Sequence, residues 1–402
     1  MLSPTHWCLK ERPAHINIQS SARLSLLTFT CAVVCLLPQA YSNKLRLAAL
    51  GLPVFHFLWC LGAQRKGMVI NMNHLQSVTL GVTQRCNLRC IWCFQDSSPN
   101  AELAATETPI EEIFKIIDLI APYTNRITLT GGEPFIRPDV REVFDHCIKQ
   151  QNLSVSVTTN SLLISEEMME YLAENHVGVI VSIDGLAEKH DKIRGVGTFN
   201  TTIKKVRQMK ALGINVALQM TVSKYNIDDL AKVINMAEEL DVFFAIQRMI
   251  PFGRGAKFSA WTLLPEDIQR AQETIKNSTY KRVHSKEVLH RPGTDSVVDF
   301  MQRYPDCVIG GCKVGMGYAY VDSSGTVYGC PFLPYKLGNV LSGKSIIEIL
   351  ETSNVINNIR NPQKYTGKCR DCRWWHACRG CRATANVYGD FMGDDPLCWY
   401  EP

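Results

Sequence analysis

The sequence predicts an α/β fold with a parallel sheet, because short strand-like segments alternate with amphipathic helix-like segments between residues 78 and 247. Strands that are separated by helices in one sheet are joined by right-handed crossovers and therefore run parallel. An open dinucleotide-binding sheet is the alternative, but no G-x-G-x-x-G turn follows the first expected strand. We expect strands at residues 78–83, 126–129, 154–158, 177–183, 215–222 and 243–247.

The first expected helix is marked by its start signals and by an apolar stripe. Thr108-Pro-Ile-Glu111 has the pattern of a capping box, and Pro109 suits the first helical position. Apolar residues then recur at helical spacing as far as Ile120. Further helices are expected at residues 140–149, 165–175, 199–212 and 227–240, and another begins near Pro265.

Composition limits the class of protein. A chain of 402 residues can hold two or three domains with a large core. The net charge of +5 is mild and spread along the chain, so we expect no nucleic-acid partner. Sixteen cysteines are unusual, and most of them lie in residues 86–93 and 307–398. Clustering at ligand spacings favours metal sites over disulfides, and hence a reducing compartment.

Residues 1–67 fall outside this alternation. The apolar runs within residues 24–63 lack the unbroken stretch of about 20 apolar residues that a spanning helix needs. They could be a membrane anchor, an exported pro-segment, or residues preceding a natural start at Met68 or Met72. We favour the third interpretation and expect a cytoplasmic protein, with membrane association through the N-terminus left open.

The most informative motif is the run Cys86-Asn-Leu-Arg-Cys90-Ile-Trp-Cys93, directly after the first expected strand. Three thiolates at this spacing can hold three irons of a 4Fe–4S cluster, which normally takes four cysteines. The fourth iron would then be open to a ligand that is not protein. A zinc site, a disulfide or buried thiols are the alternatives, but zinc prefers four N/S ligands and fits three cysteines poorly.

This run resembles the signature of the radical S-adenosylmethionine (radical SAM) family, including the aromatic Trp92. The resemblance implies a partial (β/α)6 TIM-like barrel with its reactive loops at the carboxyl ends of the strands. It also implies that the open iron binds S-adenosylmethionine, which is cleaved to a 5′-deoxyadenosyl radical. Cys86, Cys90 and Cys93 would then be the catalytic cysteines.

Thr130-Gly-Gly-Glu-Pro134 follows the second expected strand and resembles the GGEP motif of the same family. Glycines let a backbone pass close to a ligand, and a carboxylate there can accept hydrogen bonds from an ammonium group. The resemblance assigns the methionine amino group of S-adenosylmethionine to this motif. By itself the motif could be a tight turn. The implied contacts are Gly131, Gly132, Glu133 and Pro134.

Polar residues follow the fourth expected strand as well. The resemblance implies that Ser182, Asp184 and Arg194 contact the ribose and carboxylate of S-adenosylmethionine. Helix capping or a turn is the alternative for Ser182 and Asp184, and a surface charge is the alternative for Arg194. Thr159 and Asn160, after the third strand, are interpreted as structural.

The C-terminal cysteines resemble the SPASM domain, an extension of radical SAM proteins that holds two auxiliary 4Fe–4S clusters. The interleaved ligands would tie distant segments together and help a domain with little core to fold. The resemblance implies one cluster on Cys312, Cys330 and Cys381, with Cys307 as a candidate fourth ligand, and another on Cys369, Cys372, Cys378 and Cys398.

Two features of the C-terminal cysteine region also have simpler interpretations. Cys369, Cys372, Cys378 and Cys381 could instead form a zinc ribbon, since paired CxxC spacing is typical of zinc. A basic group in the same region could be solvated or could meet an anionic substrate. The group consists of Arg370, Arg373, Arg379 and Arg382.

These motifs predict a radical SAM/SPASM oxidoreductase with S-adenosylmethionine and 4Fe–4S cofactors and a flavodoxin- or ferredoxin-type electron donor. We expect a peptide or protein substrate, or alternatively a tetrapyrrole whose propionate side chains are modified. The tail from Cys381 to Cys398 and the run Met249–Arg254 look similar to the tetrapyrrole branch. A non-catalytic electron carrier is the alternative of another class. The expected domains are 1–67, an apolar N-terminal segment; 75–250, the barrel; 251–306, a connecting segment; and 307–402, the SPASM domain.

Overall fold

The computed structural model describes residues 74–99, 106–280, 282–285, 311–375 and 378–400. Cys307 and the apolar runs within residues 24–63 lie outside these residues. Among the helices in the described residues, none is both long and apolar enough to cross a membrane.

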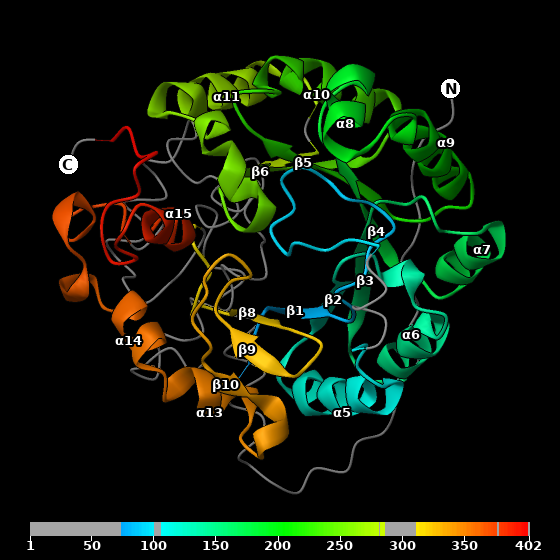
Figure 1. Cartoon of the computed structure of the whole chain (residues 1–402), viewed down its shortest axis with the longest axis horizontal. Coiled ribbons are helices and arrows are strands. Elements are labelled where there is room, and N and C mark those ends of the chain that lie inside the picture. Colours follow the sequence, from blue (N-terminus) through cyan, green and yellow to red (C-terminus); the bar gives the residue numbers. More distant parts are fainter. Residues whose placement is uncertain (1–73, 100–105, 281, 286–310, 376–377, 401–402) are drawn as a thin grey trace, which may run out of the picture. The chain divides into compact units, whose positions relative to one another are not determined.

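The described strands form one curved sheet of ten strands, in the order β10-β9-β8-β1-β2-β3-β4-β5-β6-β7 (Figure 1). All pairs from β1 through β7 are parallel, as predicted, and the sheet does not close into a full barrel. The strands are β1 Ser77–Gly81, β2 Arg126–Thr130, β3 Ser154–Thr159, β4 Gly178–Ile183, β5 Val216–Val222, β6 Phe243–Arg248, β7 Val283–Ser285, β8 Tyr318–Val321, β9 Thr326–Tyr328 and β10 Gly338–Asn339.

Four of these strands were not predicted. β7 pairs with β6 at one edge, and β8 pairs parallel with β1 at the other, with β9 and β10 antiparallel beyond it. The sheet therefore continues into the region where we expected the C-terminal domain. These strands are two to four residues long, too short for an alternating pattern to indicate them.

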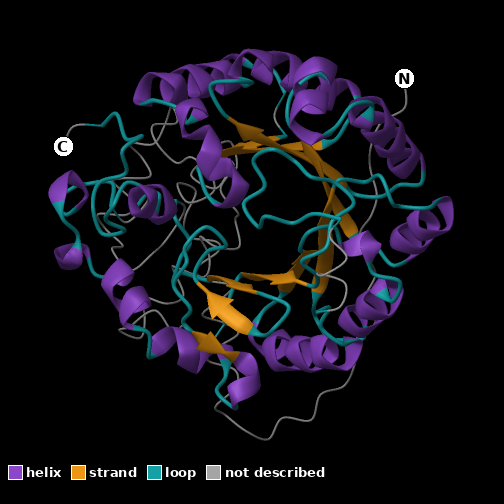
Figure 2. Cartoon of the chain, in the orientation of Figure 1, coloured by secondary structure: helices purple, strands orange, loops and turns teal. Residues whose placement is uncertain are grey.

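Helices cover the outer side of the curved sheet, as Figure 2 shows. The predicted helices are present, with ends shifted by up to three residues. A further helix, α8, lies where the sequence indicated only a loop. The α-helices are α5 Ile110–Ile120, α6 Val140–Ile148, α7 Glu166–Glu174, α8 Ala187–Arg194, α9 Thr198–Ala211, α10 Leu230–Glu239, α11 Pro265–Asn277, α13 Ile346–Glu351, α14 Asn354–Arg360 and α15 Arg382–Val387.

The predicted capping box at α5 is wrong. The helix begins at Ile110, Pro109 takes the extended conformation of the residue before it, and no side chain caps the helix. Thr108 lies outside the helix, where its carbonyl accepts a hydrogen bond from Arg137 at 3.1 Å.

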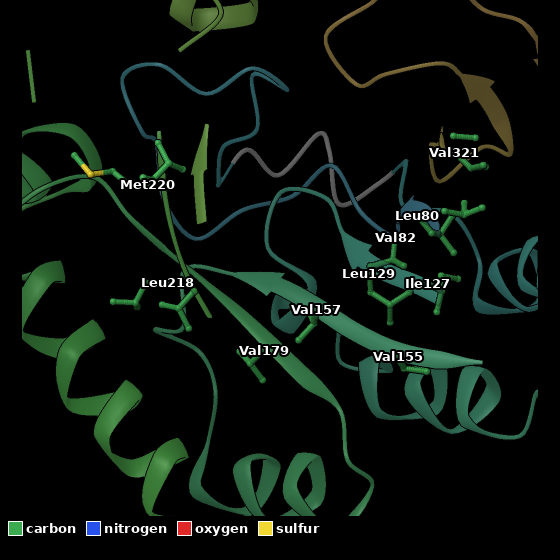
Figure 3. Close-up of a cluster of buried hydrophobic side chains, with 14 of the residues drawn as sticks. Leu80, Val82, Ile127, Leu129, Val155, Val157, Val179, Leu218, Met220 and Val321 are labelled. Atoms are coloured by element: carbon green, nitrogen blue, oxygen red, sulfur yellow. The ribbon is translucent and has the colours of Figure 1, made fainter. Parts of the chain in front are cut away.

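The core lies between the sheet and its helices. Alternate residues of strands β2 to β6 are buried, and they meet the apolar stripe of the helices. Figure 3 shows part of this cluster, including Leu80, Leu129, Val157 and Leu218. The parallel strands β1 to β4 lead at their carboxyl ends into the predicted site residues.

Candidate metal centres

The three cysteines of the CxxxCxxC run lie in the loop after β1. All three thiols are free, and Cys86 is buried whereas Cys90 and Cys93 are partly exposed. Burial raises the pKa of the Cys86 thiol to about 12, and the charges of Cys90 and Cys93 contribute in the same direction. Burial also raises the pKa of Cys90. Burial therefore favours the protonated form of Cys86 and Cys90, and a bound cation would favour their thiolates.

The GGEP loop after β2 packs directly on the cysteine loop. The backbone N–H of Gly132 donates to the Thr83 carbonyl at 2.9 Å, and that of Glu133 donates to the Arg85 carbonyl at 2.8 Å. A Cβ on Gly132 would lie 1.9 Å from the Arg85 carbonyl oxygen, and one on Gly131 would lie 2.3 Å from that of Thr83. These glycines thus permit the close approach of two loops. The role that we predicted for them toward a ligand stays a prediction.

Glu133 is fully buried and accepts three hydrogen bonds from protein groups. Its donors are the Thr159 hydroxyl at 2.7 Å, the Asn160 backbone N–H at 2.7 Å and the Phe135 backbone N–H at 3.3 Å. Burial raises the pKa of this carboxyl to about 7. Glu133 therefore holds the turn after β3 against the GGEP loop, and a direct contact with an amino group stays a prediction. Pro134 is buried at the start of the turn that follows.

Asn160, which we interpreted from the sequence as structural, links the turn after β3 to the cysteine loop. Its side-chain amide donates to the Asn87 side-chain oxygen at 2.8 Å and lies 3.9 Å from the Cys86 sulfur. The loops after β1, β2 and β3 therefore form one hydrogen-bonded assembly around Cys86.

The polar residues after β4 form a second support. Arg194, the last residue of α8, donates from Nε to the Asp184 carboxylate at 2.6 Å. The same carboxylate accepts the Thr221 backbone N–H at 3.1 Å. Arg194 has only 14% of its side chain exposed, so it is not a solvated surface charge. Its charge acts on the Cys90 thiol and lowers that group's pKa against the effect of burial. Ser182 lies in β4 and is half-buried.

Two further residues near this site were not found from the sequence. His190 is buried, and its Nδ1 accepts the Asp184 backbone N–H at 3.2 Å, while burial lowers its pKa to about 4. Arg254 donates from Nε to the Cys90 carbonyl at 3.1 Å and from its backbone to the Cys93 carbonyl at 3.0 Å. Arg254 ends the run Met249–Arg254, which looked similar to the tetrapyrrole branch of the family. In the structure its hydrogen bonds fix the loop that carries Cys90 and Cys93.

The C-terminal part of the chain brings four cysteines around one cavity. Cys369, Cys372, Cys378 and Cys398 line it, together with Trp374 and other residues of the same loops. The SPASM resemblance implied a cluster on these four cysteines, and that assignment stays a prediction, as does the zinc alternative on Cys369, Cys372, Cys378 and Cys381. In the described part of the chain, no three Cys, His, Asp or Glu side chains converge on a single ion. A cluster needs no such convergence, because each cysteine binds a different iron.

The other predicted cysteine set consists of Cys312, Cys330 and Cys381. Burial raises the pKa of the Cys381 thiol to about 11. The charge of the nearby Cys312 acts in the same direction. The Cys312 backbone N–H donates to the Cys378 carbonyl at 3.0 Å, which joins the two sets. Cys330 lies near Tyr318: burial raises the pKa of this tyrosine, and the charge of Cys330 acts in the same direction. Assignment of a cluster to Cys312, Cys330 and Cys381 stays a prediction.

Comparison with known proteins finds a match for the barrel and another for the C-terminal cysteine region. Residues 80–237 match the model of the radical SAM superfamily, and residues 312–373 match an iron–sulfur cluster-binding domain, SPASM. An AdoMet-dependent heme synthase of Methanosarcina barkeri is 29% identical, covering 83% of this chain and 99% of that protein. The mycofactocin maturase MftC of Mycobacterium tuberculosis is 28% identical, covering 80% of this chain and 82% of that protein.

A solved structure shares the fold. Streptococcus suis SuiB bound to S-adenosylmethionine superposes with a TM-score of 0.64 at 16% identity, covering 85% of this chain and 80% of that one. The chain therefore belongs to the radical SAM superfamily and carries a C-terminal SPASM domain. It is a radical SAM/SPASM enzyme whose cofactors are 4Fe–4S clusters and S-adenosylmethionine, and not the non-catalytic carrier that the sequence left open.

Proposed function

We propose that this enzyme oxidises the propionate side chains of a tetrapyrrole in haem-type biosynthesis. The observation that carries the proposal is the extent of similarity to the Methanosarcina barkeri heme synthase. It reaches across barrel and SPASM domain alike and spans 99% of that relative's length.

The residues present fit the cofactors. Cys86, Cys90 and Cys93 would hold the cluster that binds S-adenosylmethionine, and Asp184 would hold the Arg194 guanidinium in place near Cys90. When bound, these cofactors supply a 5′-deoxyadenosyl radical, which can remove a hydrogen atom from a substrate carbon. The substrate radical would then lose one further electron as the bond to its carboxylate breaks, which releases CO2 and leaves a vinyl group. The cysteine cavity near the C-terminus would hold the electron acceptor.

A peptide substrate is the second candidate. It is supported by the mycofactocin maturase, which matches this chain at nearly the same identity over 82% of its own length. Neither the tail from Cys381 to Cys398 nor the run Met249–Arg254 distinguishes a tetrapyrrole substrate from a peptide substrate. In both segments the contacts found here involve the cysteine loops themselves.

Anaerobic turnover with an isotopically labelled substrate tests the proposal. Reconstituted protein would be reduced with dithionite and given S-adenosylmethionine and iron coproporphyrin deuterated in its propionate side chains. We expect 5′-deoxyadenosine that carries deuterium, and none from a Cys90→Ala variant. Unlabelled 5′-deoxyadenosine with an unchanged tetrapyrrole would reject this substrate and favour the peptide. No 5′-deoxyadenosine under any condition would refute the assignment of the catalytic cysteines.

A further inference from the structure

Two arginines in the SPASM region are buried against expectation. Arg379 and Arg382 are the largest fully buried side chains in the described residues, with 1% and 0% of their surface exposed. Their neighbours Arg370 and Arg373 are exposed, as the sequence predicted for a solvated group. Burying a guanidinium is costly unless hydrogen bonds and an opposite charge compensate it.

The Arg382 guanidinium has hydrogen bonds but no carboxylate partner among the described residues. Its Nη1 donates to the carbonyls of Phe391 at 2.9 Å and Gly393 at 2.7 Å. Its Nη2 lies 3.9 Å from the Cys369 sulfur, and the group sits over the Tyr365 ring at 4.7 Å. The Arg382 side chain therefore contacts the Cys369 sulfur, which becomes anionic when it binds iron as a thiolate.

The backbone between the cysteines is shaped to permit this contact. Gly380 has a φ of +58°, and a Cβ on it would lie 2.4 Å from Arg382 Nη2 and 3.4 Å from the Cys369 sulfur. Any side chain at Gly380 would enter the space through which Arg382 reaches Cys369. Within the run Cys378-Arg-Gly-Cys381-Arg, the contact with Cys369 therefore depends on Gly380 and on Arg382.

A 4Fe–4S core held by four thiolates carries a net negative charge, which increases when the cluster is reduced. Hydrogen bonds and positive charge at the sulfurs favour the reduced form and raise the reduction potential. Cys369 belongs to the cavity lined by Cys372, Cys378 and Cys398, so Arg382 lies at one ligand of that site.

We propose that Arg382 is a positioning residue that tunes the auxiliary cluster held by Cys369, Cys372, Cys378 and Cys398. Its guanidinium charge, placed 3.9 Å from the Cys369 sulfur, stabilises the reduced cluster and thereby makes this site an electron acceptor for the substrate. A lysine ammonium on its shorter side chain would lie farther from that sulfur and would stabilise the reduced cluster less. The proposal rests on the assignment of a cluster to these four cysteines. It does not depend on whether the substrate is a tetrapyrrole or a peptide.

Redox titration followed by electron paramagnetic resonance tests it. The full chain would carry Cys86→Ala, Cys90→Ala and Cys93→Ala, so that only auxiliary signals remain. We expect Arg382→Gln to lower the midpoint potential of the auxiliary cluster and Arg382→Lys to lower it less. Arg370→Gln removes the same charge from the exposed residue next to Cys369, and we expect no change. A midpoint potential in Arg382→Gln equal to that of the parent would overturn the proposal.

If Arg382→Gln loses the auxiliary cluster, the midpoint potential of Arg382→Lys and the iron content of both variants decide the outcome. If Arg382→Lys keeps its iron, a lowered potential supports the tuning role and an unchanged potential refutes it. If both variants lose the auxiliary iron, Arg382 serves assembly and not tuning, and the proposal fails. Formation of 5′-deoxyadenosine by protein with an intact CxxxCxxC loop, measured in parallel, reports on the catalytic assignment separately.

Discussion

Arg248 and Asp395 form a buried ion pair that joins the barrel to the cysteine cavity. Arg248 Nη1 lies 2.8 Å from both carboxylate oxygens of Asp395, and the two side chains are 5% and 1% exposed. The same carboxylate accepts the backbone N–H groups of Cys381 at 2.9 Å and Leu397 at 3.1 Å. One side chain thus organises the loop between two predicted cluster ligands and binds it to the end of β6.

Replacing Asp395 by asparagine should destabilise the protein strongly. The change removes the charge that compensates Arg248, and breaking a buried ion pair costs about 3–5 kcal/mol. Guanidinium unfolding under anaerobic conditions measures the loss, and iron analysis should show less auxiliary iron. The matched control is Glu167→Gln, which breaks the exposed pair with Arg141 and should cost less than about 1 kcal/mol. Equal losses in the two variants would contradict this account of the pair.

Gly132→Ala should disrupt the loop that holds the catalytic cysteines. A Cβ at this position would lie 1.9 Å from the Arg85 carbonyl oxygen, so the GGEP loop and the cysteine loop must separate. We expect loss of most 5′-deoxyadenosine formation with auxiliary iron retained. Gly178→Ala is the control, since its added Cβ would meet its nearest neighbour at an ordinary 3.5 Å. Full activity in Gly132→Ala would show that the two loops need no such approach.

Much of the barrel could be predicted from its local pattern. The strands β2 to β6 carry regular alternation, and the helices between them carry apolar stripes, so each was placed within three residues. Helix α8 was missed because only His190 and Ile193 of its eight residues are buried. The pairing of β8 with β1 joins segments more than 200 residues apart, and no local pattern indicates such a pairing.

The CxxxCxxC loop could be singled out from the sequence because ligand chemistry limits cysteine spacing, but the residues that support the loop could not. Arg254, Asp395 and Arg382 act through hydrogen bonds to residues distant in sequence or through burial. Charged residues are usually solvated, so composition alone predicts the wrong environment for a buried arginine.

His190 should make stability depend on pH. Its pKa is about 4 in the folded chain, below the ordinary value of 6.5, because burial disfavours the charged form. The unfolded chain therefore binds more protons in this window. Stability is greatest above pH 6.5 and falls as pH drops toward 4, by at most about 3 kcal/mol from this group.

The difference in unfolding free energy between pH 8 and pH 5 measures this effect. We expect the difference to shrink in His190→Gln, because glutamine does not titrate. The exposed His74→Gln should leave it unchanged. A pH dependence in His190→Gln equal to that of the parent would contradict the buried neutral histidine.

Arg254→Lys should weaken the cluster of the CxxxCxxC loop. Arg254 bonds the Cys90 carbonyl and the Ser97 carbonyl and pairs with Asp96. A lysine ammonium cannot reproduce this planar set of donors. We expect faster loss of iron from this cluster to a chelator, by several-fold, whereas the exposed Arg270→Lys should match the parent. Equal rates in the two variants would count against a holding role for Arg254.

Electron–nuclear double resonance with S-adenosylmethionine labelled with ¹⁵N at its amino group tests the central claim most directly. The account predicts hyperfine coupling between this nitrogen and the reduced cluster, because three cysteines leave one iron open. The coupling should persist in Cys147→Ala, which removes a buried thiol outside the loop, and disappear in Cys90→Ala. Absence of coupling in the parent protein, with the cluster present and reduced, would show that all four irons are already closed and would contradict the account.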